Sequence, residues 1–580
     1  MSGRVGGRAG GRAIGSVTAT AAGRAAADAL AAAWPDEVRL VAAESAGDAL
    51  RAAWRSCDAV VSFLAVGATV RVLAPLLADK TTDPPVVCVD EARRYAVAVL
   101  GGHHGGNDLA ERVAGVLGCT PVITTASDAA GQTALDEYGA DLGFEIENPD
   151  ALAAVGAAVL SGEPVRLVGA AGWPLPPLPP NVGPDGAAAI VISDRRVPAT
   201  AESAVFRPPS LVVGVGCARG AAADEVDAMV GAALAAADLS ARSVRCVATI
   251  DIKADEKGIV AAAERRGLPL VTFPAGALAA VAVPNPSETV RAEVGTPSVA
   301  EAAALRAARS YGKSAELVVA KRKSAHVTVA VARLTPRGRL TIVGLGPGAR
   351  DLLTPRAVRA LRRAAVVVGL DQYVDQVRDL FRPGTRVIAS GLGEEAERAR
   401  TAVAAASAGE AVALLGSGDA GVYAMAAPAL AVAGDDIEVA GVPGVTAALA
   451  AAGLLGAPLG HDHAYISLSD LHTPWEVIER RVRAAAEGDF TVCFYNPRSR
   501  SRHWQLPRAL AVLAAHRAPE TPVGYVRNAA RADETVAVTT LADLNPAEVD
   551  MFTVVIVGSS RSRTVAGRFV TPRGYRWLSS

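Results

Sequence analysis

The sequence is poor in aromatic residues, in net charge and in paired cysteines, and each shortage excludes a class of protein. Aromatic residues make up 4% of the 580 residues, which argues against a base-stacking platform for nucleic acid. The formal net charge of -1 at pH 7 gives no footprint for nucleic acid or for an anionic membrane surface. No run of about 20 apolar residues is present, so we expect no membrane helix.

The 6 cysteines are scattered along the chain, and none belongs to a Cys-x-x-Cys pair. This spacing argues against a zinc site and a disulfide framework, and it fits a reducing, cytoplasmic compartment. The start of the chain (1–30) is basic and then alanine-rich, and it is interpreted as a loose Gly/Arg tail before a first strand rather than a secretory signal. Arg12 and Gly15 border only a short apolar run there, and Arg24 soon follows.

The most abundant feature of the sequence is a regular alternation of two kinds of segment. Short runs of Val, Ile and Leu alternate with longer alanine-rich helical stretches, a pattern typical of parallel sheets covered by helices. Two seams interrupt it: proline-rich GWPLPPLPPNVGP (172–184) and polar ARLTPRGR (332–339). We therefore predict a multidomain α/β protein. The predicted domains are 1–205, 208–333 and 339–580, the last with lobes at about 339–455 and 460–580.

Three glycine-rich loops stand out after the second seam, each next to a predicted buried strand. They read GLGPGARDLLT (344–354), GSGDAGVYAMA (416–426) and AGVPGVTAALAAAGLLGAPLG (440–460). Glycine lets the backbone turn sharply and approach a ligand closely. Alone, each loop is equally a plain strand-to-helix turn, with Asp419 as a helix cap in the second.

In chain order these loops precede HDHAYISLSD (461–470), DFTVCFYNPRSRSR (489–502), VRNAARADETV (526–536) and VTPRGY (570–575). The ordered set resembles the tetrapyrrole methylases, and the later blocks resemble precorrin-3B C17-methyltransferases among them. The resemblance implies two α/β lobes of the class III methyltransferase kind, with S-adenosylmethionine in the cleft between them. It also implies methylation of a precorrin at C17 with ring contraction in cobalamin biosynthesis, and a homodimer formed through this region.

The same resemblance implies a set of site residues. The residues expected at the cofactor are Gly416, Gly418, Asp419, Gly421, Val422, Tyr423, Thr446, Ala447, Tyr495, Asn496, Asn528, Ala529 and Thr553. Those expected at the precorrin or cobalt-precorrin substrate are Gly346, Pro347, Gly348, Asp351, Ser469, Asp470 and Arg498. His461 and Asp462 are expected to orient the substrate or handle protons.

Two features of this region keep an alternative interpretation. His461, Asp462, His463 and His472 have spacing that suits a metal, but methyl transfer from a sulfonium needs alignment and a dry site more than a Lewis acid. We therefore expect no metal. Arg498, Arg500 and Arg502 either pair with substrate carboxylates or belong to a solvated loop.

The first 333 residues carry a second ordered set of blocks. They are GGHHGGND (101–108), GVGCARG (214–220), ATIDIKADEKG (248–258), VPNPSETV (283–290) and VGTPSVAEAAAL (294–305). These resemble the cobalt-precorrin-5A hydrolases, which open a lactone on the macrocycle and release acetaldehyde. Lactone opening needs an activated water and then a base. Candidates for these roles are His103, Lys253 and Glu256, together with Asp128, Ser298 and Glu301.

Each candidate in this region also has a structural interpretation. GGHHGGND suits an anion at a helix start, or it is a turn in which Asn107 or Asp108 caps the helix. Lys253 and Glu256 have the spacing of an ordinary helix pair. Ser298 and Glu301 have that of a capping box.

The sequence therefore predicts a bifunctional methyltransferase and lactone hydrolase. One alternative keeps the methyltransferase and makes the first 335 residues a non-catalytic binding module. Another is a nicotinamide oxidoreductase that grips ribose through Asp371, after a predicted strand at 364–370.

Overall fold

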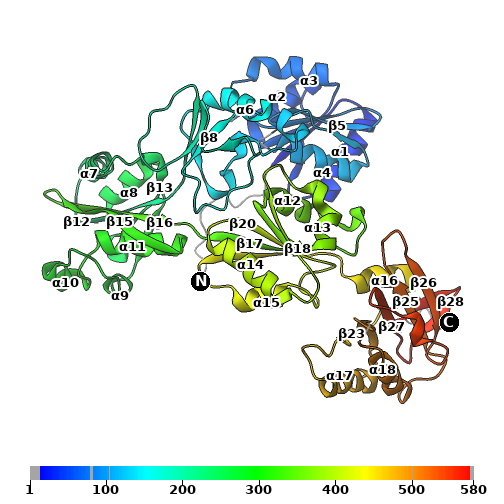
Figure 1. Cartoon of the computed structure of the whole chain (residues 1–580). Coiled ribbons are helices and arrows are strands. Elements are labelled where there is room, and N and C mark those ends of the chain that lie inside the picture. Colours follow the sequence, from blue (N-terminus) through cyan, green and yellow to red (C-terminus); the bar gives the residue numbers. More distant parts are fainter. Residues whose placement is uncertain (1–12, 79–81, 103–104, 500, 575–580) are drawn as a thin grey trace. The chain divides into compact units, whose positions relative to one another are not determined.

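The computed structural model describes residues 13–78, 82–102, 105–499 and 501–574. Contacts within the chain divide it into two compact units. The first runs to Val331, except that Ala171–Pro177 and Leu305–Leu317 group with the second, which continues from Ala332. Among the described helices, none combines the length and apolar character that crossing a bilayer requires. Figure 1 shows the elements of each unit.

The first unit begins with a six-stranded sheet in the order β2-β1-β3-β4-β5-β6, in which only β4 and β5 pair antiparallel. Its strands are β1 (Ile14–Thr18), β2 (Val38–Leu40), β3 (Ala59–Phe63), β4 (Val86–Val89), β5 (Tyr95–Leu100) and β6 (Thr120–Val122). Its helices are α1 (Ala21–Ala33), α2 (Ala46–Ser56), α3 (Val66–Leu73) and α4 (Gly106–Leu117). Thr20 and Ser45 cap α1 and α2 by accepting from backbone amides of the first turn.

Two five-stranded sheets follow in the chain. The first has the order β7-β11-β10-β8-β9 and the second β14-β13-β12-β16-β15. The strands of the first are β7 (Glu145–Ile146), β8 (Val165–Val168), β9 (Val182–Gly183), β10 (Ala188–Ile192) and β11 (Ser203–Arg207), with helix α6 (Ala151–Ser161) beside them. The second contains β12 (Leu211–Cys217), β13 (Val244–Ile250), β14 (Leu270–Phe273), β15 (Ser314–Lys323) and β16 (Val327–Thr335), and the helices of this region include α7 (Ala223–Ala236), α8 (Lys257–Arg265) and α11 (Ala300–Tyr311).

The first lobe of the second unit is a wholly parallel sheet in the order β19-β18-β20-β17-β21. Its strands are β17 (Gly338–Gly344), β18 (Val366–Leu370), β19 (Arg386–Ser390), β20 (Ala411–Gly416) and β21 (Ile437–Val442). Every residue of β18 and β20 is buried, as expected for central strands covered on both faces. The helices of this lobe are α12 (Pro355–Arg363), α13 (Asp371–Val377), α14 (Glu395–Ser407) and α15 (Ala426–Val432). Because β17, β20 and β21 are parallel neighbours, the loops after them meet at one edge of the sheet.

The second lobe departs from the parallel pattern that the alternation predicted. Its sheet has the order β23-β24-β27-β25-β26, and only β23 and β24 pair parallel. Its strands are β23 (His463–Ser467), β24 (Thr491–Tyr495), β25 (Pro522–Arg527), β26 (Thr535–Thr540) and β27 (Thr553–Val557). For β25 and β26 the reason is their short connection (528–534), which cannot hold the crossover of about a dozen residues that parallel neighbours need. Helices α16 (Ala447–Leu455), α17 (Trp475–Glu487) and α18 (Gln505–Ala514) pack on this sheet or against each other, and β22 (Gly456–Ala457), β28 (Arg563–Val565) and β29 (Arg568–Val570) form a small separate sheet.

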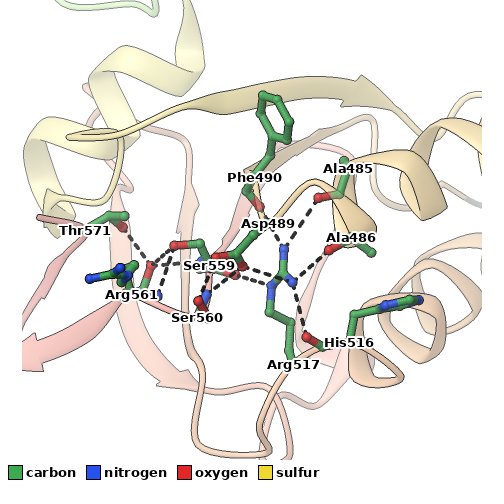
Figure 2. Close-up of polar contacts among 12 residues, drawn as sticks. Ala485, Ala486, Asp489, Phe490, His516, Arg517, Ser559, Ser560, Arg561 and Thr571 are labelled. Carbon is green, nitrogen blue, oxygen red and sulfur yellow. Dashed lines mark hydrogen bonds and ion pairs between the residues drawn. The ribbon is translucent and has the colours of Figure 1, made fainter. Parts of the chain in front are cut away.

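A buried arginine fastens several segments of the second lobe together (Figure 2). The guanidinium of Arg517, which follows α18, donates to the carbonyls of Ala485 and Ala486 at the end of α17 and to that of Phe490. It also lies 3.1 Å from the carboxylate of Asp489. Arg517 therefore adds a second donor to the carbonyls of Ala485 and Ala486, which also accept from the amides of Phe490 and Asp489.

Candidate functional site

The three glycine-rich loops of the first lobe are bonded to one another at the carboxyl ends of their strands. Gly346 and Gly418 exchange two backbone hydrogen bonds, of 3.0 and 2.8 Å. The carboxylate of Asp419 accepts from the amide of Gly421 at 2.8 Å and from that of Gly444 at 3.1 Å. Asp419 therefore holds its own loop and ties it to the loop that follows β21.

Close backbone contact explains why glycine is needed where these loops meet. A Cβ on Gly444 would lie 2.2 Å from the carbonyl oxygen of Gly418, and one on Gly344 would lie 2.7 Å from the amide nitrogen of Gly444. Gly418 also has a φ of +62°, which side chains other than glycine adopt only with strain. The glycines at these positions are thus required for the loops to pack together.

A cavity of about 360 Å³ opens beside these loops and is walled by both lobes of the second unit. Its size falls within the range of about 300–1,000 Å³ that is usual for sites of small ligands. The residues expected from the sequence that line it are Pro347, Gly416, Gly418, Val422, Tyr423, Thr446, Ala447, Tyr495, Asn496, Asn528, Ala529 and Thr553. They come from loops far apart in the chain, so the fold brings these residues together.

Strained backbone gathers at the same place. Tyr423, Asn496, Asn528 and Ala530 all have φ between 50° and 58°, and the first three line the cavity. Non-glycine residues hold this conformation only where the surroundings fix them, which is common at binding sites. Here hydrogen bonds fix them: the Asn496 amide donates to Ser467, the Asn528 amide to Asp533, and the Tyr423 hydroxyl to the carbonyl of Tyr465.

Hydroxyl groups and aromatic rings give the cavity its polar and flat surfaces. The hydroxyl of Tyr495 lies 2.6 Å from that of Thr446 and accepts from the amide of Ala448 at 3.0 Å. The ring of Tyr495 packs 5.3 Å from that of Tyr423. Burial raises the pKa of both phenols, and it raises that of neighbouring Tyr465 to about 12. All three tyrosines are therefore neutral at physiological pH.

These residues fit S-adenosylmethionine by the chemistry of their donors and acceptors. Backbone groups of Gly416 to Gly418 can bond to polar groups of an adenosyl or methionyl moiety, and the tyrosine rings offer faces for an adenine. Among the described residues that line the cavity, Glu395 on the first-lobe wall is the one acidic side chain. The site is thus suited to a ligand that carries both a flat apolar part and polar arms.

Several predicted residues lie outside the cavity lining. Asp419 and Gly421 act in the loop contact described above. Gly346 and Gly348 flank Pro347 in the first loop, where both have positive φ. Asp351 is exposed on the short 3-10 helix that follows. The expectation that these residues touch a ligand directly stays a prediction.

His461 and Asp462 lie at the wrong end of their strand to reach the cavity. They precede β23, whereas Tyr495 and Asn496 come at the carboxyl end of β24, with which β23 pairs parallel. A five-residue strand spans roughly 15 Å. The side chain of Asp462 is 79% exposed, and among the described residues no group of three His, Cys, Asp or Glu side chains is placed to hold a metal ion.

Three predicted substrate residues of the second lobe form hydrogen bonds with other residues of the chain. Arg498 donates to the carbonyls of Pro546 and Ala547. The carboxylate of Asp470 accepts from Gln505 at 2.9 Å, and Ser469 receives a bond from Arg502. Arg502 also donates to the Asn496 carbonyl and so supports a cavity residue from behind. Arg500 lies outside the described residues.

The cavity also contains residues that sequence reasoning missed. From the first lobe these are Leu370, Gln372, Tyr373, Leu392, Glu395, Arg398, Leu415, Ser417, Ala424 and Met425, and from the second Val526, Arg531, Met551, Phe552 and Val554. Some adjoin predicted residues and follow from the strand ends. Others have no sequence motif around them: Leu392 lies on the loop before α14 and Arg398 on α14 itself. Only the fold shows that these residues line the cavity.

Two predicted catalytic residues of the first unit, Lys253 and Glu256, lie together near the carboxyl ends of β12 and β13. The ammonium of Lys253 lies 2.9 Å from the carboxylate of Glu256, and both residues are buried. Glu256 also accepts from the amide of Gly220. The hydrogen bond from Lys253 contributes most to lowering the Glu256 pKa. Burial raises the pKa of Cys217 beside them, although the Lys253 charge opposes the shift.

The remaining candidates of the first unit are not brought into one site. The carboxylate of Glu301, fully buried, accepts from the side chain and amide of Asn285 and from the amide of Lys321. No bond joins it to Ser298 in a capping box among the described contacts, and the buried Ser298 hydroxyl has no partner there. Asp128 accepts from Asn107 and Thr125 in a different domain region. His103 lies outside the described residues.

Family models match four consecutive stretches of the chain. The family described as tetrapyrrole (corrin/porphyrin) methylases matches residues 339–545. The N-terminal, central and C-terminal regions of cobalamin synthesis protein G match residues 48–128, 133–208 and 211–332.

Individual relatives match the last part of the chain. A Salmonella typhimurium protein named "Probable cobalt-factor III C(17)-methyltransferase" is 48% identical over 239 residues, which are 41% of this chain and 99% of that protein. The precorrin-3B C(17)-methyltransferase of a Sinorhizobium species is 43% identical over 235 residues, 39% of this chain and 91% of that protein. The solved structure of the methyltransferase CobJ is 38% identical and covers 40% of this chain and 100% of its own, with a TM-score of 0.39. The chain spans 46% of the cobalt-factor III methyltransferase of Priestia megaterium, which is 42% identical over 249 residues and 41% of this chain.

Proposed function

Because the chain belongs to the tetrapyrrole methylases, whose methyl donor is S-adenosylmethionine, we propose that its last part methylates a precorrin-3B or cobalt-factor III macrocycle at C17 with ring contraction. The observation that carries the proposal is the 360 Å³ cavity lined by the glycine loops of one lobe and the strained residues of the other. The names of the relatives support the position of methylation.

The bound donor supplies a methyl group on a sulfonium. The chain's own residues bind, orient and exclude water. Gly416, Gly418 and Thr446 form the first-lobe wall for the donor, while Asn528 and Thr553 face it from the second lobe. Alignment of donor and acceptor accounts for most of the acceleration in such a transfer, because no strong base or metal is needed to activate a sulfonium.

The labelled methyl group of the donor is expected at C17 of the product. Incubation of the full chain with labelled S-adenosylmethionine and the precorrin, followed by NMR of the product, locates it. The double variant Asp419→Ala/Tyr423→Ala removes the loop clasp and a cavity wall, and we expect it to weaken donor binding by at least about tenfold. Label at another carbon, or unchanged affinity in the variant, contradicts the proposal.

We also propose a second activity for the first unit, the opening of a macrocycle lactone with release of acetaldehyde. The three consecutive matches to cobalamin synthesis protein G support it, and the buried pair of Lys253 and Glu256 supplies a charged group to activate water or to accept a proton. A non-catalytic module that binds intermediates is the alternative. The wider proposal is of a cytoplasmic enzyme that forms a homodimer through its methylase part.

Acetaldehyde release separates these two roles of the first unit. The full chain, given the cobalt-containing lactone, is expected to release one acetaldehyde per macrocycle, measured with a coupled alcohol dehydrogenase. Lys253→Met should lower the rate by about 100-fold or more, as loss of a general acid or base does. Lys257→Met, at an exposed neighbouring position, is the matched control. If the wild-type chain releases none, the first unit is a binding module.

A further inference from the structure

Arg398 occupies an unusual place on the first-lobe wall of the cavity. It lies near the start of α14, is only 5% exposed, and lines the cavity. Neither the sequence motifs nor the donor-binding loops include it.

The partners of this buried guanidinium are all neutral. Its Nε donates to the Ser390 hydroxyl at 2.9 Å and its Nη2 to the Gly391 carbonyl at 2.6 Å, while Nη1 has only the Met425 sulfur at 3.7 Å. Within the described residues no carboxylate lies within 4.0 Å of it.

Two other buried arginines, Arg207 and Arg517, pair with a carboxylate. Arg207 pairs with Glu147 at 2.5 Å and Arg517 with Asp489 at 3.1 Å. Arg502, which lies behind the second-lobe wall, has only neutral hydrogen-bond partners among the described residues, but it is close enough to Asp470 for that carboxylate's charge to act on it. A buried charge without a counter-charge is costly, so such a charge is expected mainly where a bound ligand supplies the opposite charge. For Arg398 the open side is the cavity.

The surroundings of Arg398 indicate what completes it. Large apolar side chains of the lining remain exposed, with Leu392 at 77%, Phe552 at 51% and Met551 at 44%. Such surfaces suit a ligand with a broad apolar face. A guanidinium whose Nη1 has only a thioether as its partner suits an oxyanion on an arm of that ligand, and carboxylate is the group that matches its planar donors best.

We propose that Arg398 binds a carboxylate of the ligand held in this cavity, either an acid side chain of the tetrapyrrole or the carboxylate of the donor's methionyl group. The proposal rests on the methyltransferase function and adds a residue that determines which ligands the site accepts. Nη1, which now faces a thioether, and Nη2 provide the donors for the carboxylate.

Equilibrium binding tests the proposal without requiring turnover. The probes are uroporphyrin, a stable tetrapyrrole with carboxylate arms, S-adenosylhomocysteine, and 5′-methylthioadenosine, which lacks the amino-acid part. In Arg398→Met we expect the affinity for one carboxylate ligand to fall at least about tenfold, the size of a lost charged hydrogen bond, with 5′-methylthioadenosine unaffected. Arg400→Met is the matched control, because Arg400 lies on the same helix, is 60% exposed and pairs with Glu397.

Each pattern of results decides a point. Loss for uroporphyrin alone places the carboxylate on the macrocycle, and loss for S-adenosylhomocysteine alone places it on the donor. Unchanged affinity for all probes, or an equal loss that includes 5′-methylthioadenosine, overturns the proposal. If Arg398→Met does not fold, Arg398→Lys, which keeps a charge but not the planar fork, must show the same selective loss to a smaller degree. Wild-type protein that binds these ligands but methylates another carbon would refute only the proposed reaction.

Discussion

Replacing Gly444 by alanine is expected to lower the affinity for S-adenosylhomocysteine by at least about tenfold and to destabilise the first lobe of the second unit by about 1–3 kcal/mol. The added methyl group would lie 2.2 Å from the Gly418 carbonyl oxygen and 2.8 Å from the backbone of Gly344. Neither contact is with a flexible side chain, so the loops must separate. Separation would break the bond from the Gly444 amide to Asp419 and displace the cavity wall.

Gly453→Ala is the control for this substitution. Gly453 lies on helix α16, nine positions later, and a Cβ there meets no atom within 4 Å. Alanine favours a helix over glycine by about 1 kcal/mol, so this variant should be equally or more stable and should bind the ligand normally. Calorimetric titration and denaturant unfolding measure both effects. A Gly444→Ala protein with wild-type affinity would show that the loop packing does not shape the site.

The alternation of apolar runs and alanine-rich helices predicted the α/β class because strands buried on both faces leave a continuous signal. The run at 364–370, for example, contains β18 (Val366–Leu370). The mixed sheet of the second lobe escaped prediction, since an apolar strand looks alike whether its neighbour is parallel or antiparallel. For β25 and β26 only the short connection (528–534) distinguishes the two arrangements, and the sequence motif there predicts only that Asn528 and Ala529 contact the cofactor.

The candidate site was predictable to the extent that its residues follow strand ends in recognisable blocks. Thr446 and Tyr495 belong to such blocks and come within 2.6 Å of each other. His461 and Asp462 belong to one as well, but they precede their strand, and a motif does not say which end of a strand faces the cavity. Arg398 has no local signal, because its place depends on how α14 packs against the loop after β19.

Replacing Arg517 by methionine is expected to destabilise the second lobe by about 2 kcal/mol or more, because two carbonyls lose a hydrogen-bond donor. Its side chain is 2% exposed and bonds to carbonyls of the α17 end and of Phe490 (Figure 2). It also donates to the carbonyl of Gly558. Methionine fills similar space but offers no donor, so the carbonyls of Phe490 and Gly558 would lose their hydrogen-bond donor. Each such loss costs about 1–3 kcal/mol, whereas the carbonyls of Ala485 and Ala486 keep their backbone bonds. Hydrogen exchange of peptides from β24 and β27 reports the local free energy of opening.

Arg508→Met provides the control, since Arg508 lies on α18, is 61% exposed and makes only a 3.6 Å ion pair with Glu479. Exposed pairs of this kind contribute about 0–1 kcal/mol, so exchange in this variant should match the wild type. Arg517→Lys keeps the charge but has fewer donors and no fixed plane. Its exchange protection should therefore lie between that of Arg517→Met and that of Arg508→Met. Equal protection in Arg517→Met and Arg508→Met would mean that the buried carbonyls do not depend on this guanidinium.

The loss of stability at acid pH is a second, independent test of the contact between Arg517 and Asp489. Burial acts to raise the pKa of Asp489, but hydrogen bonds from Ser560 and the charge of Arg517 outweigh it, so the pKa lies below its ordinary value. A lowered folded-state pKa means that the stabilisation is present above the ordinary pKa and is lost as the pH falls through the lowered one. Without Arg517 the Asp489 pKa rises again. Exchange protection of the second lobe should therefore fail at a higher pH in Arg517→Met than in the wild type or in Arg508→Met, because only the Ser560 hydrogen bonds and the charge of Arg561 then oppose the effect of burial.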